Sequence, residues 1–363
     1  MRQKNRAYLP QTHLPIKLYM VYHTISLSTA TIKYRGGLYC VKIKIKANTN
    51  PLKFLVERSQ AQKQKTVYNI YMEKLHVPVL LSEVLAGLQP QSGESYLDLT
   101  AGYGGHASKI LDVTQDYKDS VLVDRDEFAI QQLKKQFPEV AKIMHTDFYS
   151  AVLQLFECGK TFDMILADFG VSSPQLDMEE RGFSFRYEAP LDMRMDQRQK
   201  LTADTVINHY SERELAEIFI KYGEIPQGRA HMLARIIVHH RPIRTTRELA
   251  ELIRVRLHYH ARVHPATQVF QAVRIVVNQE LEQIERVLPL LPKLLNPGGR
   301  LAIITFHSLE DRLVKDYFKE ATSYGEESEL EIINKKPIVA ESEELVINPR
   351  ARSAKLRMAR KRN

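Results

Sequence analysis

Short apolar runs alternate with amphipathic segments between residues 96 and 170. Runs over 96–100, 120–124, 142–147 and 161–170 predict four strands, and connecting stretches such as "EFAIQQLKKQF" place apolar residues at helical spacing. The fourth run is apolar almost throughout, as expected of a strand covered on both faces. Strands that alternate with helices predict the fold class, which is α/β with a doubly wound, Rossmann-like parallel sheet.

The next strand-like run, "RLAIITF" (300–306), follows only after about 130 residues, far more than one crossover connection needs. The intervening chain has a helical pattern. Capping boxes that begin at Ser211 and Thr245 mark two helix starts, and a single long helix is expected over 266–288. The sequence therefore predicts an inserted helical subdomain at 181–285.

The net charge of +9 is concentrated at the two ends of the chain. Residues 1–71 hold 13 Lys or Arg and one acid, and residues 350–363 hold seven basic residues and no acid. The body between them carries a charge of about −10, so the overall charge alone is a poor guide to partners. We expect 1–71 to be a basic extension that is poorly ordered, or a mis-assigned start ahead of Met72, and dispensable for activity. The alternative is a basic arm that grips the RNA backbone.

The composition favours a cytoplasmic protein. No window contains 18 consecutive apolar residues, and the apolar stretch near the start lacks the features of a secretory signal, so no membrane span is expected. The only cysteines, Cys40 and Cys158, fit neither a disulfide framework nor a metal site, and we expect no bound metal.

A glycine loop, "DLTAGYGGHA" (98–107), follows the first predicted strand. Its spacing and the later Asp124 match the dinucleotide-binding pattern, but S-adenosylmethionine fits the same pattern. Asp98 would repel a diphosphate, whereas it suits the amino group of S-adenosylmethionine. Phe148 after the third strand suits an adenine, and Asp168 ends the fourth strand. Because carboxyl ends of parallel strands share one edge, these residues predict a site for S-adenosylmethionine.

Several long motifs resemble the bacterial ribosomal RNA small-subunit methyltransferase H family. They are "HVPVLLSEVL", "GYGGH", "VDRD", "GVSSPQLDMEERGFSFRYEAPLDMRMD", "VFQAVRIVVNQEL", "FHSLEDRLVK" and "NPRARSAKLR", and together they span about residues 76–360. The resemblance implies methylation of the N4 amine of a cytidine in the decoding region of 16S ribosomal RNA. It also implies a methyltransferase domain made of 72–180 and 286–363, with a basic C-terminal tail, and a substrate-recognition role for 181–285. Ala101 departs from the family pattern, which has an aromatic residue there.

The resemblance agrees with the expected cofactor site and extends it. The glycine loop is expected to let the backbone approach the methionine part, Asp124 to bond both ribose hydroxyls, and Phe148 to lie on the adenine side. Phe148 alone could equally be a core residue. The expected cofactor-binding residues are Asp98, Gly104, Gly105, His106, Asp124, Phe148, Asp168 and Gln175.

Methyl transfer from a sulfonium is an in-line displacement, so alignment and a positioned nucleophile supply most of the acceleration. The N4 amine of cytidine is a weak nucleophile because its lone pair is delocalised into the ring. A group that accepts an N4 proton would help. Asp168 and the "GVSSP" turn with Ser173 are the candidate catalytic groups. The alternative is that Asp168 only binds the cofactor.

Residues that contact RNA are harder to recognise. Gln271, Arg274 and Asn278 form a polar stripe on one helix face, which is explained equally well by an internal hydrogen-bond network. His307 and Ser308 follow the fifth strand and are expected to face the same cleft.

The segment "RGFSFR", with Arg181 and Arg186, interleaves arginine and phenylalanine, which suits phosphate contacts and base stacking. Its phenylalanines could instead anchor the insertion. The basic tail is expected to bind phosphate in a salt-dependent way.

The expected partner is 16S ribosomal RNA in the small ribosomal subunit. Three alternatives stay open at this point: a methyltransferase for another nucleic-acid amino group, an NAD-dependent oxidoreductase, and a ribosome assembly factor without catalytic activity. The sequence indicates neither the oligomeric state nor the assembly stage of the substrate.

Overall fold

In the computed structural model the described residues are 19–21, 31–34, 37–39, 78–257, 264–323 and 328–363. The chain forms two compact units, Met1–Lys74 and Leu75–Asn363. In the first unit, three short strands form an antiparallel sheet: β1 (Tyr19–Val21), β2 (Thr31–Tyr34) and β3 (Gly37–Tyr39). The expectations for the order of 1–71 fall largely outside the described residues.

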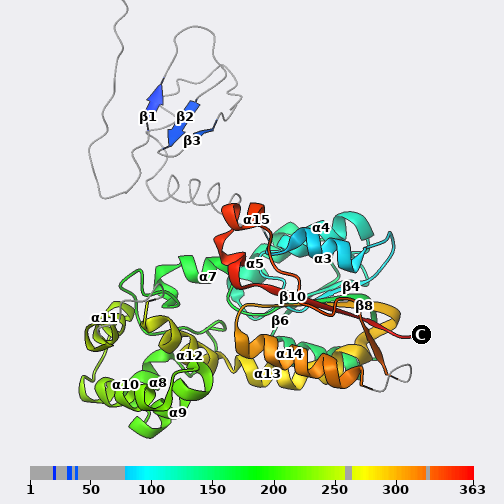
Figure 1. Ribbon diagram of the computed structural model, residues 1–363. Coiled ribbons are helices and arrows are strands. Elements are labelled where there is room, and N and C mark those ends of the chain that lie inside the picture. Colours follow the sequence, from blue (N-terminus) through cyan, green and yellow to red (C-terminus); the bar gives the residue numbers. More distant parts are fainter. Residues whose placement is uncertain (1–18, 22–30, 35–36, 40–77, 258–263, 324–327) are drawn as a thin grey trace, which may run out of the picture. The chain divides into compact units, whose positions relative to one another are not determined.

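The second unit is built on a seven-stranded sheet (Figure 1). Its strands are β4 (Tyr96–Asp98), β5 (Val121–Asp124), β6 (Lys142–His145), β7 (Phe162–Asp168), β8 (Leu295–Thr305), β9 (Leu330–Ile332) and β10 (Lys355–Lys361). The spatial order is β6-β5-β4-β7-β8-β10-β9, in which neighbours from β6 to β8 are parallel and β10 is antiparallel to both of its neighbours. This order confirms the predicted doubly wound, Rossmann-like fold, with the chain direction across the sheet reversing at β4.

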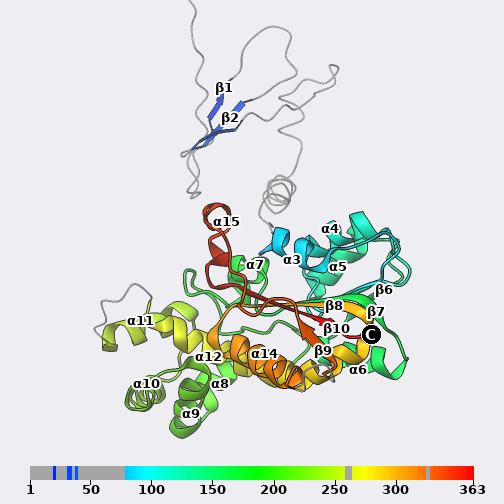
Figure 2. The same cartoon turned by 45° about the vertical axis from the view of Figure 1, so that its right-hand side comes forward.

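Helices cover both faces of the sheet (Figures 1 and 2). One face carries α3 (Leu81–Leu88), α4 (Gly105–Thr114) and α5 (Glu127–Gln136). The other carries α6 (Phe148–Glu157), α13 (Glu280–Val287), the 3₁₀ helix η2 (Leu288–Leu294) and α14 (Ser308–Ala321). Strand β7 shows the strand alternation, because Met164 and Leu166 pack on the first face and Ile165 and Ala167 on the second.

Between β7 and α13 the chain forms a group of helices. After the short α7 (Ser173–Asp177) and η1 (Glu179–Arg181) come α8 (Ala203–His209), α9 (Glu212–Gly223), α10 (Gln227–His239), α11 (Thr246–Leu257) and α12 (Ala266–Asn278). Their apolar residues belong to the same core as the α6 face of the sheet. The insertion and the sheet therefore share one continuous hydrophobic interior.

Two helix predictions in this region are tested directly. The capping box at Ser211 is confirmed, since Ser211 and Glu214 bond reciprocally at the start of α9. The single helix over 266–288 is wrong. The chain breaks at Gln279, whose φ of 51° closes α12 and opens α13. This break turns the chain from the insertion back onto the sheet.

The C-terminal region also differs from expectation. After α15 (Ser342–Ile347) and the 3₁₀ helix η4 (Pro349–Ser353), the basic stretch that was expected as a C-terminal tail enters the sheet as β10. Leu356 and Met358 are buried against the α3 face, and the Arg357 guanidinium pairs with Asp311 at 2.7 Å. Alternating apolar residues among the basic ones explain why the stretch folds as a strand.

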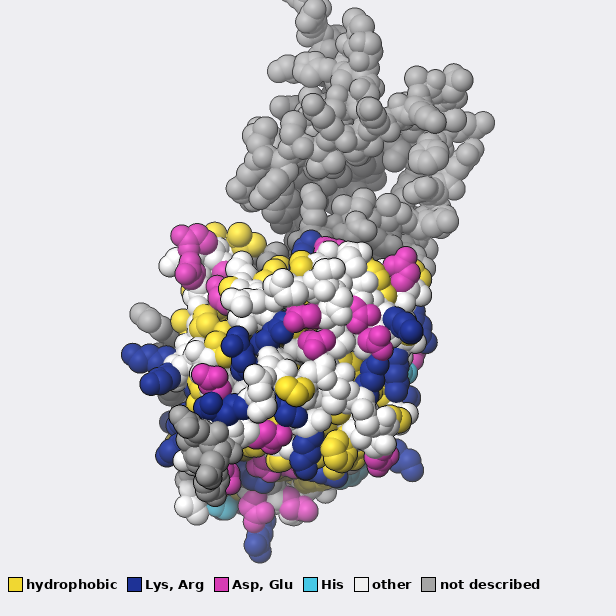
Figure 3. Space-filling view, turned by 90° about the vertical axis from the view of Figure 1, so that its right-hand side faces the viewer, with side chains coloured by type: hydrophobic (Ala, Val, Ile, Leu, Met, Phe, Trp, Pro, Cys, Tyr) yellow, Lys and Arg dark blue, Asp and Glu magenta, His cyan; other side chains and the backbone are white. Residues whose placement is uncertain are grey.

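No helix among the described residues has the length and apolar character to cross a bilayer. On the face seen in Figure 3, acidic, basic and hydrophobic side chains are interspersed. Among the described residues, that face therefore has no continuous positively charged patch of the kind that would mark an RNA interface.

Candidate active site

Three neighbouring strands of the sheet each end in an aspartate. Asp98, Asp124 and Asp168 are the last residues of β4, β5 and β7. Because β4 lies between β5 and β7, the three carboxyl groups come together at the carboxyl edge, where the sheet reverses its order. Folds of this type bind their ligands at this position.

Asp124 holds the glycine loop onto the sheet. Its Oδ2 accepts a hydrogen bond from the Gly102 backbone N–H and its Oδ1 accepts one from Asp126 N–H, both at 2.8 Å. The loop itself depends on glycine at Gly104, where φ is 78° and an added Cβ would lie 2.4 Å from the Phe137 ring. The sequence pattern of strand, glycine loop and helix therefore has a specific steric reason.

Asp98 is buried beneath this loop. Its Oδ2 accepts a hydrogen bond from the Tyr96 hydroxyl at 2.8 Å and its Oδ1 accepts one from Thr100 N–H at 3.1 Å. Burial raises the pKa of Asp98 to about 7, against the opposing effect of these hydrogen bonds. Burial also raises the pKa of Asp124. The site thus contains carboxyl groups that resist ionisation.

Asp168 is the least satisfied of the three acids. Its backbone N–H donates to Thr100 Oγ1 at 2.6 Å, but among the described residues its buried Oδ1 has no hydrogen-bond partner. Its pKa lies well above the usual value, first because of burial and then because of the charges of Asp98 and Glu310. The side chain keeps 22% exposure, so Asp168 can meet a ligand.

His106 lies beside Asp168 without neutralising it. Its Nδ1 is 3.9 Å from Asp168 Oδ2, and its Nε2 lies 2.9 Å from the Val79 carbonyl oxygen. Burial lowers the pKa of His106 to about 4, so the ring is neutral near pH 7. The acid cluster therefore receives no positive charge from this histidine.

These observations test whether S-adenosylmethionine fits. Clustered, buried carboxyl groups that raise one another's pKa favour a cationic ligand, because a positive charge relieves their repulsion. The sulfonium and ammonium groups of S-adenosylmethionine provide such charge, whereas the diphosphate of a dinucleotide would add negative charge. The unpartnered oxygen of Asp168 and the glycine cradle also suit a bound ligand. The residues present fit S-adenosylmethionine.

The other predicted cofactor residues pack around this cluster or hydrogen-bond near it. Gly105 begins α4 and an added Cβ would be 2.7 Å from Pro78, so the close packing of the loop depends on it. Phe148 is buried against Phe169, with ring centroids 5.2 Å apart, which also fits the core role left open for it. Gln175 is buried and bonds Ser172 N–H and Asp126 Oδ2. Ser173 begins α7.

Sequence reasoning missed the role of Asp126. It caps α5 through Phe128 N–H and accepts hydrogen bonds from Gln175 at 2.8 Å and Arg181 at 2.9 Å. Arg181 is only 2% exposed and also donates to the carbonyls of Arg194 and Met195. The substrate contact predicted for Arg181 is not supported, because its guanidinium is buried and used in a structural network. The "VDRD" motif contained Asp126 and could have indicated it.

The polar stripe on α12 is also engaged internally. Gln271 donates to the Tyr222 carbonyl at 3.2 Å, and Arg274 forms a bidentate pair with Glu280 at 2.8 and 2.9 Å. Asn278, 1% exposed, accepts from Met195 N–H and donates to the Met193 carbonyl. Internal hydrogen bonding accounts for both amides: Gln271 ties α12 to the end of α9, and Asn278 ties the segment before α8 to the end of α12.

The remaining predicted substrate residues are more accessible. Arg186 is exposed on the loop before α8, while Phe183 is buried and Phe185 packs against Phe270, so both phenylalanines anchor the insertion. His307 caps α14 in a capping box with Glu310. Ser308 hydrogen-bonds Glu224 at the end of α9. His307 and Ser308 thus lie where the insertion meets the carboxyl edge of the sheet.

The strand order and the acid cluster define a Rossmann-like methyltransferase that uses S-adenosylmethionine. Residues 73–362 match the MraW methylase family, and the chain belongs to that family. Ribosomal RNA small subunit methyltransferase H of Trichormus variabilis is 50% identical over 293 residues, covering 79% of this chain and 92% of that protein. The protein of the same name from a Cyanothece species is 48% identical over 291 residues, covering 80% and 95%. The resemblance stated from the sequence motifs is confirmed.

Among solved structures, an rRNA methylase from Streptococcus thermophilus is similar with a TM-score of 0.36 and 8% identity, covering 80% of this chain and 99% of that one. With a TM-score this low, the fold is assigned from the strand order of the chain itself.

Proposed function

We propose that this protein methylates the N4 amine of a cytidine in the decoding region of 16S ribosomal RNA, with S-adenosylmethionine as methyl donor. Family membership over residues 73–362 and relatives named for small-subunit ribosomal RNA methylation support the proposal. The observation that carries it in the structure is the acid cluster at the switch point of the sheet, in which Asp168 Oδ1 has no hydrogen-bond partner among the described residues.

Bound S-adenosylmethionine supplies an electrophilic methyl group on a sulfonium. The glycine loop at Gly104 and Gly105 would hold its methionine part, Asp124 its ribose, and the region of Phe148 and Gln175 its adenine side. Because both oxygens of Asp98 already accept hydrogen bonds, Asp98 would act on the ligand through its charge when ionised and not through a direct hydrogen bond.

Asp168 is proposed to act on the acceptor amine. A carboxylate that accepts an N4 proton localises the nitrogen lone pair. The positive charge of bound S-adenosylmethionine would favour the ionised form of Asp168, and the raised pKa of its carboxyl group then makes it a strong acceptor for the proton that the methylated amine must lose. Neutral His106 next to it preserves this basicity. The turn that contains Ser173 is proposed to position the base beside Asp168.

The target cytidine has to leave its stack to reach a site at the end of the sheet. Arg186, His307 and Ser308 are proposed as contacts for the surrounding RNA. Arg274 is proposed only as a positioning residue, because Glu280 holds its guanidinium.

The test offers labelled S-adenosylmethionine, small ribosomal subunits and naked 16S RNA from cells that lack the endogenous enzyme. The full chain and a chain that starts at Met72 are compared, and the product nucleoside is identified by mass spectrometry. The expected product is N4-methylcytidine at one site with both chains. Methylation of another base or of another atom would overturn the assignment, and binding without transfer would favour an assembly factor.

A further inference from the structure

Two motifs from distant parts of the sequence meet at one cavity. Phe306, His307 and Ser308 of "FHSLEDR" line it from one side, and Arg352, Ser353 and Lys355 of "NPRARSAKLR" line it from the other. The cavity has a volume of about 350 Å³. The pairing of Thr305 in β8 with Lys355 in β10 brings the motifs together. Nothing in the proposed chemistry of methyl transfer uses the second motif.

The cavity is basic. Arg352 is exposed and makes no hydrogen bond or ion pair with any residue in the described part of the chain. Lys355 bonds Asp311 at 2.9 Å, but the same carboxylate also pairs with Arg357 at 2.7 Å, so one acid faces two cations. Within the described residues the lining contains no carboxylate, and Ser353 adds a hydroxyl. Such a set recognises an anion with several acceptor oxygens.

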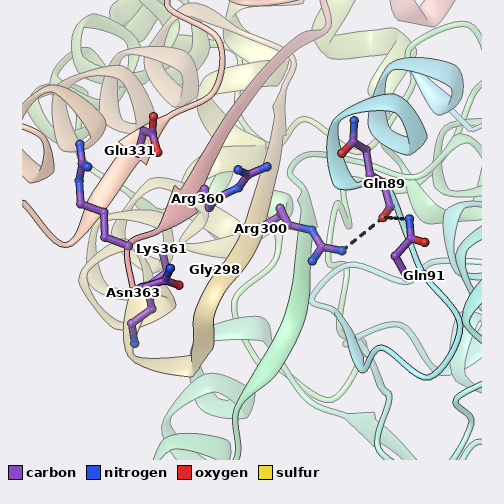
Figure 4. A pocket seen from close by; sticks show the side chains of 9 residues that line it. Gln89, Gln91, Gly298, Arg300, Glu331, Arg360, Lys361 and Asn363 are labelled. Carbon is purple, nitrogen blue, oxygen red and sulfur yellow. Dashed lines mark hydrogen bonds between the residues drawn. The ribbon is translucent and has the colours of Figure 1, made fainter.

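A larger basic pocket shows why this one stands out. At the opposite edge of the sheet, Arg300, Arg360 and Lys361 line a cavity of about 490 Å³ (Figure 4). There the Arg300 guanidinium is held by both oxygens of Glu94, at 2.5 and 2.7 Å, and by the Leu88 carbonyl. Glu331 also lines that cavity. Arg362 lines it as well, so that cavity remains basic, but it contains a carboxylate and lies at the opposite edge of the sheet from Asp168, whereas the Arg352 cavity lies at the same edge as Asp168.

The position of the Arg352 cavity indicates its ligand. Asp168 pairs with Ile304 of β8, and the cavity begins two residues later on the same edge of the sheet. Two strand spacings, about 10 Å, separate β7 from β10. An RNA strand whose base enters beside Asp168 would carry its backbone past this point.

We infer that Arg352, Ser353 and Lys355 form a binding site for a backbone phosphate that flanks the methylated nucleotide. The inference rests on the proposed function and assigns a substrate contact to the "NPRARSAKLR" motif. The phosphate is held outside the acid cluster, so the negative backbone does not approach Asp98 or Asp168.

The test measures binding of small ribosomal subunits and of naked 16S RNA to the full chain across a range of salt concentrations. Arg352→Gln is expected to weaken binding of both about tenfold and to lower the salt slope by about 0.7 to 0.9, the contribution of one phosphate contact. Arg352→Lys is expected to restore part of the affinity, because it keeps the charge but loses the planar fork. Arg360→Gln is the matched control, since it removes an exposed arginine from the other end of β10.

Equal effects of Arg352→Gln and Arg360→Gln would overturn the inference. A loss with small subunits but not with naked RNA would also overturn it, because a ribosomal protein would then be the ligand. Binding is measured without catalysis, so the two proposals fail separately: a chain that methylates nothing but still shows the Arg352 effect contradicts only the proposed function. Unchanged affinity for S-adenosylmethionine in each variant shows that folding is intact.

Discussion

The carboxyl edge of the sheet has two halves of opposite character. Around β4, β5 and β7, three aspartates gather with raised pKa values and one oxygen of Asp168 has no partner among the described residues. Around β8 and β10, the cavity contains Arg352 and Lys355 and no carboxylate within the described lining. We propose that the acidic half binds the cationic methyl donor and that the basic half binds the anionic RNA backbone.

In the acidic half, Asp126 is already paired with Arg181, and breaking this ion pair is expected to have the largest effect of the changes considered. Arg181→Met would leave the Asp126 carboxylate buried without its cation, which we expect to cost about 3–5 kcal/mol of unfolding free energy. Urea denaturation measures it. Arg213→Met is the control, because its pair with Glu217 is exposed and its loss is expected to leave the unfolding free energy nearly unchanged. If both variants lose the same stability, the pair is not structural and Arg181 becomes available again as a substrate contact.

Substitution of Asp168, whose Oδ1 has no partner among the described residues, is expected to have the next largest effect. Asp168→Asn removes the proton acceptor, and we expect the single-turnover rate of methyl transfer to small ribosomal subunits to fall about a hundredfold. Calorimetry with S-adenosylmethionine separates a catalytic role from a binding role, and Asp112→Asn, an exposed acid on α4, serves as control. Normal turnover together with unchanged cofactor affinity would remove Asp168 from both roles.

The third prediction concerns pH. The pKa of Asp98 is about 7 in the folded protein and 3.8 in the unfolded chain, so between these values only the folded protein keeps the proton. The protonated carboxyl group therefore stabilises the fold at low pH, and this stabilisation is lost as the pH rises toward 7. Ionised Asp98 favours a cation, so the affinity for S-adenosylmethionine should rise up to about tenfold between about pH 6 and pH 8. Calorimetry across this range checks it. The Asp98→Asn variant should show a flatter profile, and an identical slope in both proteins would contradict the assignment.

The smallest expected effect is the coupling between the acidic half and the basic half of the carboxyl edge, and it tests whether the two act independently. Three strand spacings, about 14 Å, separate β4 from β10. We expect the combined variant Asp98→Asn and Arg352→Gln to show additive losses in the free energy of the overall reaction, within about 0.5 kcal/mol. The measured quantity is kcat/KM for small ribosomal subunits in the four proteins of the cycle. A larger coupling energy would mean that the two halves act as one site.

The amino-acid sequence determined much of this protein. The strand runs and the glycine loop predicted the sheet and its edge, because strand periodicity and positive φ at glycine are local properties. Asp98, Asp124 and Asp168 follow from the same reasoning, since each ends a recognisable strand. The motifs were sufficient to identify the family, which residues 73–362 bear out.

Tertiary structure decided which polar residues are available. Arg181 and Asn278 looked like substrate contacts, but distant partners, Asp126 and the backbone of Met193 and Met195, bury them. The basic end of the chain looked like a tail, yet pairing with β8 makes it a strand and leaves Arg352 beside the site. Burial and pairing depend on residues far apart in the sequence, so local pattern could identify these side chains but not what each one contacts.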